Sequence, residues 1–490
     1  MKKNVRKVYY EIFPRYFYDS NSSGVGDYLG IAEKHLYFKE LEIDNLVFPS
    51  ILENYEELKP RSFIQKHYGS IDDFKKMVQL LKMKDIKINM IFDFDKADSY
   101  FKQFENLQTI LKNDVSENEL KIKDETIQME NQDVTKVIDV EWMVQSKIEK
   151  FLEIIKFYNF LKIDGIIFKN IYKVNFPKLS IDESSHLVIN SLMEKIKENI
   201  SDINLIAILD YKTFYQQNTE QLNLLKFDEF IFDYFSEFWL NDQDFKIEIK
   251  KYNWLKMLKF ALKMQNLSKD YSTFIFNNWE YGKIASRLSK KQGTLEYLQK
   301  FILGFFILFD SNFYLVQGDE IGQENILNSD VKNKKIHPEI SQENNKVNFA
   351  WNSNKAMGLN EKEISYYLTP KNYLKNNLLE NYKNKNSVWW WVKNLLYFKK
   401  MYFTNYSISK KIIFSMYFYP DVFKIKLNNF ESHMIYLNFS NKNKKFLHNI
   451  VGKNFVVKYD SYNSENINNT KIKELKPFQI IILEKNEKKL

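Results

Sequence analysis

Short apolar runs alternate with longer amphipathic stretches from the start of the chain to about residue 400. The runs are rich in β-branched and aromatic residues, which is typical of buried strands. They are VYYEIF (8–13), NLVF (45–48), KINMIFDF (87–94), DGIIF (164–168), NLIAIL (204–209), EFIFDYF (229–235), STFIFN (272–277) and FYLVQ (313–317). Eight strands with helices between them predict a (β/α)8 TIM barrel. The competing doubly wound sheet lacks a G-x-G-x-x-G motif after its first strand.

The amphipathic stretches predict the helices between these strands. Examples are residues 70–85 and 146–162, and either Ser70 or Asp72 is a candidate cap for the first of them. The apolar run FILGFFILFD (301–310) is too short to cross a bilayer and predicts a buried helix. The sequence therefore predicts no membrane segment.

Two changes of pattern suggest domain boundaries. Residues 100–137 are polar, charged and without clear periodicity, so we assign 99–137 to a reduced insertion. After about residue 405, short alternating runs with Asn-rich turns predict an antiparallel β-sandwich domain at 405–490. The barrel is then expected at 1–98 and 138–404.

Composition narrows the class of protein. The chain has 490 residues, is 44% hydrophobic and contains no cysteine, which excludes disulfides and thiolate metal sites. Its basic start, MKKNVRKVYYEIF, lacks the apolar core of a signal peptide, so we expect a cytoplasmic protein. The formal charge is +9, but the lysines are interleaved with acids and no base-reading motif occurs. We therefore expect no nucleic-acid partner.

Seven segments in order carry a family resemblance. They are residues 8–31, HYGSIDDF (67–74), IDVEWMVQSKI (138–148), FYLVQGDEIGQEN (313–325), FAWNSNKAMGLN (349–360), SVWWWVKNLLYFKK (387–400) and LKPFQIIILE (475–484). Together they resemble glycoside hydrolase family 13, the α-amylase family, in the branch of oligo-1,6-glucosidase, trehalose-6-phosphate hydrolase and α-glucosidase. The resemblance implies a barrel, a domain B (here 99–137) and retaining hydrolysis of α-glucosides.

The catalytic positions of that family are substituted. Its fourth strand normally ends in D-G-F-R-x-D, whose last Asp is the nucleophile, but KIDGIIFKN (162–170) has Lys169 there. The resemblance places Asp210 at the general acid and Glu280 at the third carboxylate. A carboxylate about 4 Å from the cationic transition state contributes roughly −4 kcal/mol at an effective dielectric of about 20, and a protonated lysine roughly +4. That difference of about 8 kcal/mol corresponds to about a millionfold in rate.

The substrate-gripping positions are changed too. By resemblance they fall at Asp95, Lys96, Ile167, Trp279 and Arg287. Ile167 stands for the usual Arg, while Lys96 and Trp279 stand for two usual histidines. We expect a partly filled pocket in which Lys169 pairs with Asp210 or Glu280, because an unpaired buried ammonium is costly.

One loop offers alternating oxygen ligands, as an EF-hand loop does. Its ligands would be Asp19, Asn21, Ser23, the carbonyl of Val25 and Asp27. The resemblance places the family's metal loop here, which implies a structural Ca²⁺. A polar turn without metal is the open alternative.

These observations predict a catalytically inactive relative of the α-glucosidases. Its role would be binding, regulatory or structural, with another protein or an oligosaccharide as partner. The alternative is an active glycoside hydrolase that uses non-standard carboxylates, for which Asp93, Asp95, Asp210 and Glu280 are candidates.

Overall fold

The computed structural model describes the chain in stretches that include all or part of each of the eight predicted barrel strands. The stretches are residues 6–52, 68–114, 145–171, 183–210, 224–233, 273–275, 277, 283–288, 295–308, 311–326, 347–365, 369–403, 413–416, 421–426, 433–445, 455–463 and 472–485. No helix within them is long and apolar enough to cross a membrane.

Eight parallel strands close into a barrel in chain order. Their bounds are β1 Val8–Glu11, β2 Asn45–Phe48, β3 Lys87–Asp93, β4 Gly165–Lys169, β5 Asn204–Asp210, β6 Glu229–Asp233, β7 Thr273–Phe274 and β8 Asn312–Val316. Each strand starts within two residues of the start of its predicted run, although β7 is much shorter than predicted. The predicted TIM barrel is confirmed.

Helices of very different length accompany these strands. Their bounds are α1 Tyr28–Glu33, α2 His35–Glu40, α4 Ile71–Lys82, α5 Ala97–Asp114, α6 Gln145–Phe160, α7 Glu183–Asn199, α12 Ile284–Arg287, α13 Leu295–Ile307, α15 Leu378–Lys383 and α16 Val388–Phe403. The 3-10 turns that matter below are η2 Phe94–Lys96, η6 Asp319–Ile321 and η8 Lys371–Leu374.

The chain divides into two compact units that cut across the barrel. The first comprises Met1–Leu46, His67–Ile86 and Ile231–Leu490, and the second comprises Val47–Lys66 and Lys87–Phe230. Each unit is described by itself below.

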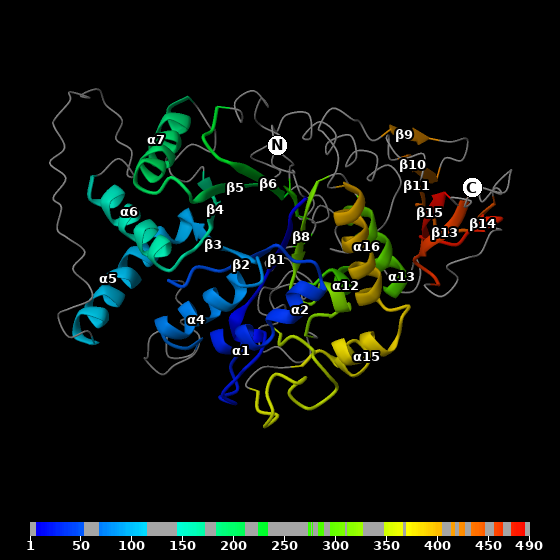
Figure 1. The fold of residues 1–490 in the computed structure, drawn as a ribbon, viewed down its shortest axis with the longest axis horizontal. Coiled ribbons are helices and arrows are strands. Elements are labelled where there is room, and N and C mark those ends of the chain that lie inside the picture. Colours follow the sequence, from blue (N-terminus) through cyan, green and yellow to red (C-terminus); the bar gives the residue numbers. More distant parts are fainter. Residues whose placement is uncertain are drawn as a thin grey trace, which may run out of the picture. The chain divides into compact units, whose positions relative to one another are not determined.

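In the first unit, α13 is the buried helix predicted from its apolar sequence. Its residues from Leu298 to Ile307 are all buried, and it packs against α16 (Figure 1). Gly304 permits this close approach, because a Cβ there would fall 2.9 Å from the indole nitrogen of Trp391. That indole nitrogen donates a hydrogen bond to the carbonyl of Lys300 at 2.7 Å.

Helix α4 of the first unit begins at one of its two predicted caps. The Ser70 hydroxyl accepts from the backbone N–H of Asp73 at 3.1 Å, and the Asp73 carboxylate accepts from the backbone of Ser70 at 3.0 Å. This reciprocal capping box makes Ser70, not Asp72, the cap.

In the second unit, aromatic residues hold strands to helices. Phe92 of β3 and Phe168 of β4 both contact Phe151 of α6, with ring centroids 5.1 and 6.2 Å apart. Helix α5 corrects the sequence reading, because Ala97–Asp114 lies largely in the segment assigned no periodicity. Tyr100, Phe104 and Leu107 are buried at helical spacing. The rest of the predicted insertion, 115–137, lies outside the described residues, so domain B stays a prediction.

The carboxy-terminal region forms two antiparallel sheets, as predicted. The larger has the order β13-β15-β11-β10-β9, and the smaller pairs β12 with β14. Their bounds are β9 Ile413–Met416, β10 Val422–Lys426, β11 His433–Asn438, β12 Lys444–Lys445, β13 Phe455–Asp460, β14 Glu474–Leu475 and β15 Ile480–Lys485.

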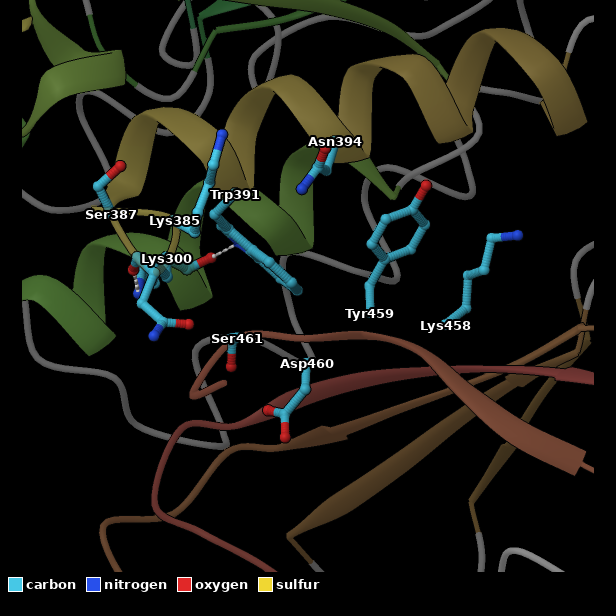
Figure 2. A pocket seen from close by; sticks show the side chains of 10 residues that line it. Lys300, Lys385, Ser387, Trp391, Asn394, Lys458, Tyr459, Asp460 and Ser461 are labelled. Carbon is cyan, nitrogen blue, oxygen red and sulfur yellow. Dashed lines mark hydrogen bonds between the residues drawn. The ribbon is translucent and has the colours of Figure 1, made fainter. Parts of the chain in front are cut away.

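Aromatic contacts join this region to the barrel helices within the first unit. Phe301 of α13 meets Phe439 edge-on at 4.9 Å, and Tyr297 stacks on Tyr462 at 3.8 Å. Between α16 and β13 lies a pocket of about 20 Å³ (Figure 2). That volume holds about one water molecule, so this junction is closely packed.

Candidate functional site

Lys169 is the last residue of β4, where the nucleophile was expected by resemblance. Phe168 packs against Phe151 of α6 and therefore faces the helices outside the barrel. Because side chains alternate along a strand, Ile167 and Lys169 face the barrel interior. Lys169 is partly buried, whereas Ile167 is completely buried.

The neighbouring strand fixes what stands beside these two residues. In the parallel register of β3 and β4, Ile91 is level with Ile167, and Asp93 is level with Lys169. Ile91 is also buried. The level at which the resemblance expects an Arg, at Ile167, is thus apolar on both β3 and β4.

Asp93 is a carboxylate held in place at the strand edge. Its Oδ1 accepts the side-chain amide of Asn170 at 2.7 Å and the backbone N–H of Asp95 at 3.0 Å. Asn170 adopts a positive φ of 55°, a conformation that Asn tolerates better than most residues. Sequence reasoning missed Asn170, and its position directly after Lys169 was the available signal.

The remaining predicted site residues of this edge are described only in part. Asp95 is exposed and Lys96 partly buried on the turn η2. Phe168 is level with Ala207 of β5, so residue 208 is level with Lys169, and Asp210 lies two residues further along. That offset is roughly 7 Å at about 3.3 Å per residue. The Asp210 side chain, Trp279 and Glu280 lie outside the described residues, so the three-carboxylate arrangement and the Lys169 ion pair stay predictions.

Arg287 belongs to a buried polar cluster that the sequence did not predict. We call Asn277, Lys283, Arg287, Asp319 and Glu320 the β8 cluster. All five are buried, and Arg287 has no exposed surface. The structure therefore places Arg287 in the protein interior, where its charge acts on the Asp319 carboxylate.

Asp319 is balanced by cations and amides within this cluster. Burial raises its pKa to about 6, and the opposing influences are Lys283, the Asn277 amide, the backbone N–H of Ile284 and Arg287. The Asn277 amide donates to Asp319 Oδ2 at 2.8 Å. Lys283 donates to the carbonyl of Gln317, and burial lowers the pKa of its ammonium group.

Glu320 is held by hydroxyl groups. Tyr37 and Tyr10 donate to its Oε1 at 2.6 and 2.7 Å, and the backbone N–H of Gly318 donates to its Oε2 at 2.9 Å. Burial nevertheless raises the pKa of Glu320 to about 7. The adjacent acids of QGDEIG were the only sequence signal for this cluster.

The predicted metal loop brings together part of its oxygen set. Ser23 Oγ lies 3.5 Å from Asp19 Oδ1 and 3.2 Å from the Val25 carbonyl oxygen. Asp19 also accepts from the backbone of Gly24 at 2.8 Å and from the Asn360 amide at 2.7 Å. Oxygens this close together fit a shared cation.

Asp27 does not join that group. It is the cap of α1 and accepts from the backbone of Gly30 at 2.6 Å, while its other oxygen accepts from the backbone of Ser20 at 2.9 Å. Burial raises the pKa of Asp27. Across the described residues no cluster of three or more His, Cys, Asp or Glu could hold a metal. Any cation would therefore rely on Asp19 with neutral oxygens.

Comparison with known proteins gives the family. The sequence profile described as "Alpha amylase, catalytic domain" matches residues 11–128 and 132–407, more than half of the chain. Trehalose-6-phosphate hydrolase of Bacillus subtilis is 33% identical over 90 residues, which are 17% of this chain and 16% of that protein. Oligo-1,6-glucosidase of Parageobacillus thermoglucosidasius is 34% identical over 88 residues, with the same two shares. The matched part thus spans about 16% of the length of these curated relatives.

Solved structures match over nearly the whole chain. Trehalulose synthase of Pseudomonas mesoacidophila MX-45 has a TM-score of 0.71 at 14% identity and covers 99% of both chains. Trehalose-6-phosphate hydrolase of Bacillus licheniformis has a TM-score of 0.69 at 18% identity and covers 98% of this chain and 99% of its own. At such identities the likeness concerns the fold alone. Because the profile match extends through the closed barrel, this chain belongs to the alpha-amylase catalytic-domain family, glycoside hydrolase family 13.

Proposed function

We propose that this chain is a catalytically inactive, α-glucosidase-like member of the family. The observation that carries the proposal is Lys169 at the interior-facing end of β4, level with Asp93 on β3. A retaining glycosidase needs a carboxylate nucleophile about 5–5.5 Å from its acid. A lysine at the nucleophile position cannot form the glycosyl ester and, when protonated, repels the cationic transition state.

The apolar level below Lys169 supports the same proposal. Ile91 and Ile167 stand side by side on β3 and β4 and are buried. They offer no hydrogen bond to a sugar hydroxyl, so a glucoside would lose its orienting contacts on these strands. Misplacement by about 1 Å can by itself cost about a hundredfold in rate.

The retained role in this proposal is interaction with another protein, in the cytoplasm. Loss of the charged groups around the old subsite makes tight binding of a glucoside there unfavourable, whereas the barrel and its buried clusters are maintained. A structural calcium ion on Asp19, Asn21, Ser23 and the Val25 carbonyl is part of the proposal, without Asp27, which caps α1. Relatives bear the names of α-glucoside hydrolases, and we propose that their chemistry is absent here.

The test is turnover of p-nitrophenyl α-glucoside, maltose and isomaltose by the purified chain. We expect no hydrolysis above background, and the matched variant Lys169→Met should behave identically. Activity that disappears in Asp93→Asn, Asp210→Asn or Glu280→Gln would instead establish hydrolysis by non-standard carboxylates. Activity that is equal in all these variants comes from a contaminating enzyme.

A further inference from the structure

One pocket of the first unit contains none of the residues at the end of β4. It is enclosed by the amino-terminal ends of α13 and α16, the turn after β8 and helix α15, and its volume is about 280 Å³. This size is close to the lower end of the range of roughly 300–1,000 Å³ found for small-molecule sites. None of its lining residues is aromatic, so stacking does not define its ligand.

Gln299 makes this pocket a built site. Its side chain lines the pocket and is only 2% exposed. The Nε2 amide nitrogen is buried and has no hydrogen-bond partner within the protein. Buried amide groups are normally satisfied, because leaving a donor unmet is costly. The unmet donor therefore points to a ligand atom that accepts a hydrogen bond.

Gly322 lies directly beside this amide in the pocket lining. It adopts a φ of +69°, and a Cβ at this position would fall 2.7 Å from Gln299 Oε1. Its carbonyl accepts from the amides of Asn376 at 3.0 Å and Asn372 at 3.4 Å. The wall beside Gln299 thus contains backbone and amide groups that are hydrogen-bonded to one another.

The charges of the pocket favour a neutral ligand. Glu296 is paired with Lys300 at 2.8 Å, and Glu380 is paired with Lys383 at 2.7 Å. Glu324 and Lys375 add one charge of each sign to the lining. An anion would meet carboxylates, and a cation would meet Lys375 and the Gln299 N–H group. A ligand rich in hydroxyl groups can donate to the carboxylates and accept from the amide and the ammonium.

We propose that this pocket binds a neutral polyhydroxylated small molecule, a monosaccharide or a polyol. The Gln299 amide donates to one ligand hydroxyl, and Lys375 and Glu324 orient others. The proposal does not rest on the loss of catalysis, since the pocket shares no residue with the β4 edge. It gives the chain a ligand site that is independent of the substituted catalytic positions.

The test is isothermal titration calorimetry of the full chain with glucose and with sorbitol. We expect saturable binding of at least one of them, with an apparent affinity at least tenfold weaker in Gln299→Leu. Lys375→Ala, a change at an exposed position, should weaken binding about threefold and keeps the test decisive if Gln299→Leu does not fold. The control Gln79→Leu alters an exposed amide on α4 and should bind as the native chain does.

Two outcomes would overturn the proposal. One is the absence of a saturable heat of binding with both glucose and sorbitol. The other is binding that Lys169→Ala abolishes while Gln299→Leu and Lys375→Ala leave it intact, which would assign the sugar to the barrel mouth.

Discussion

The carboxyl-terminal ends of β4 and β8 differ in how deeply their charged side chains are buried. On the turn after β3 and at the end of β4, Asp95 is exposed and Lys169 is partly buried. At the end of β8, Asp319 and Glu320 are fully buried among Lys283, Arg287 and two tyrosines. The first end leaves its charged groups near solvent, whereas the second holds its charged groups in the protein interior.

The two ends should therefore differ in how much a substitution lowers the free energy of unfolding. Removing one member of a buried charged cluster leaves the others desolvated and uncompensated, which costs about 3–5 kcal/mol. A change at a partly exposed strand end costs far less, commonly within about 1 kcal/mol. Residues at the end of β4 can therefore be replaced at little cost in stability, whereas residues that balance buried charge cannot.

The largest expected effect follows from this contrast. Arg287→Met should destabilise the chain by about 3–5 kcal/mol at a pH where Asp319 is ionised, because the buried Asp319 carboxylate is left with one cation fewer. Urea unfolding at pH 8 measures the change, and Lys169→Met serves as the control, with an expected effect within about 1 kcal/mol. Equal losses in the two variants would remove the distinction between the two strand ends.

The second prediction asks whether chemistry returns when the carboxylates are restored. Lys169→Asp combined with Asp210→Glu should fold normally but remain at least roughly a thousandfold below the typical turnover of about 10 per second. Ile91 and Ile167 still leave the sugar without orienting contacts. Steady-state hydrolysis of maltose and isomaltose measures this, and turnover within about tenfold of that typical value would refute it.

The third prediction concerns pH. The folded pKa of Glu320 is about 7 and its ordinary value is 4.5, so between these values the folded chain binds a proton that the unfolded chain lacks. Stability should therefore fall as the pH rises through about 4.5 to 7 and change little above that window. Asp319, with a pKa of about 6 against 3.8, acts in the same direction.

The size of the Glu320 contribution is on the order of 2–3 kcal/mol between pH 5 and pH 8. Urea unfolding at pH 5, 6, 7 and 8 should show the decline, and Glu320→Gln should flatten it whatever its effect on absolute stability. A variant with the same slope as the native chain would show that Glu320 is not the titrating group.

The sequence predicted the barrel well and the buried clusters poorly, for one physical reason. Strands such as β2 contain a short continuous apolar run, here residues 46–48, so their local pattern is sufficient. Helix α5 was missed because its buried face is a few aromatic residues, Tyr100 and Phe104 among them, within a strongly polar segment. The position of Lys169 followed from a motif within a single strand.

Sites assembled from distant segments left no such signal. Glu320 becomes a shared acceptor only when it meets Tyr10 and Tyr37. Gln299 becomes an unmet donor only when the turn at Gly322 and helix α15 close around it. Burial and partnership at these residues are tertiary properties, which residue spacing does not encode.

The smallest expected effect concerns the loop after β1. Calcium on Asp19, Asn21, Ser23 and the Val25 carbonyl would stabilise the fold by mass action, about 1–3 kcal/mol at ten to a hundred times the Kd. Since Asp27 caps α1 and only one carboxylate is left for the ion, we expect weak binding and a rise in Tm of about 2 °C or less in millimolar calcium. Thermal unfolding with calcium and with chelator measures this rise, and Asn21→Ala should reduce it without removing the acceptor for Gly24 and Asn360. An unchanged Tm in the native chain would leave a loop held by its own hydrogen bonds, with Asp19 satisfied by N–H groups.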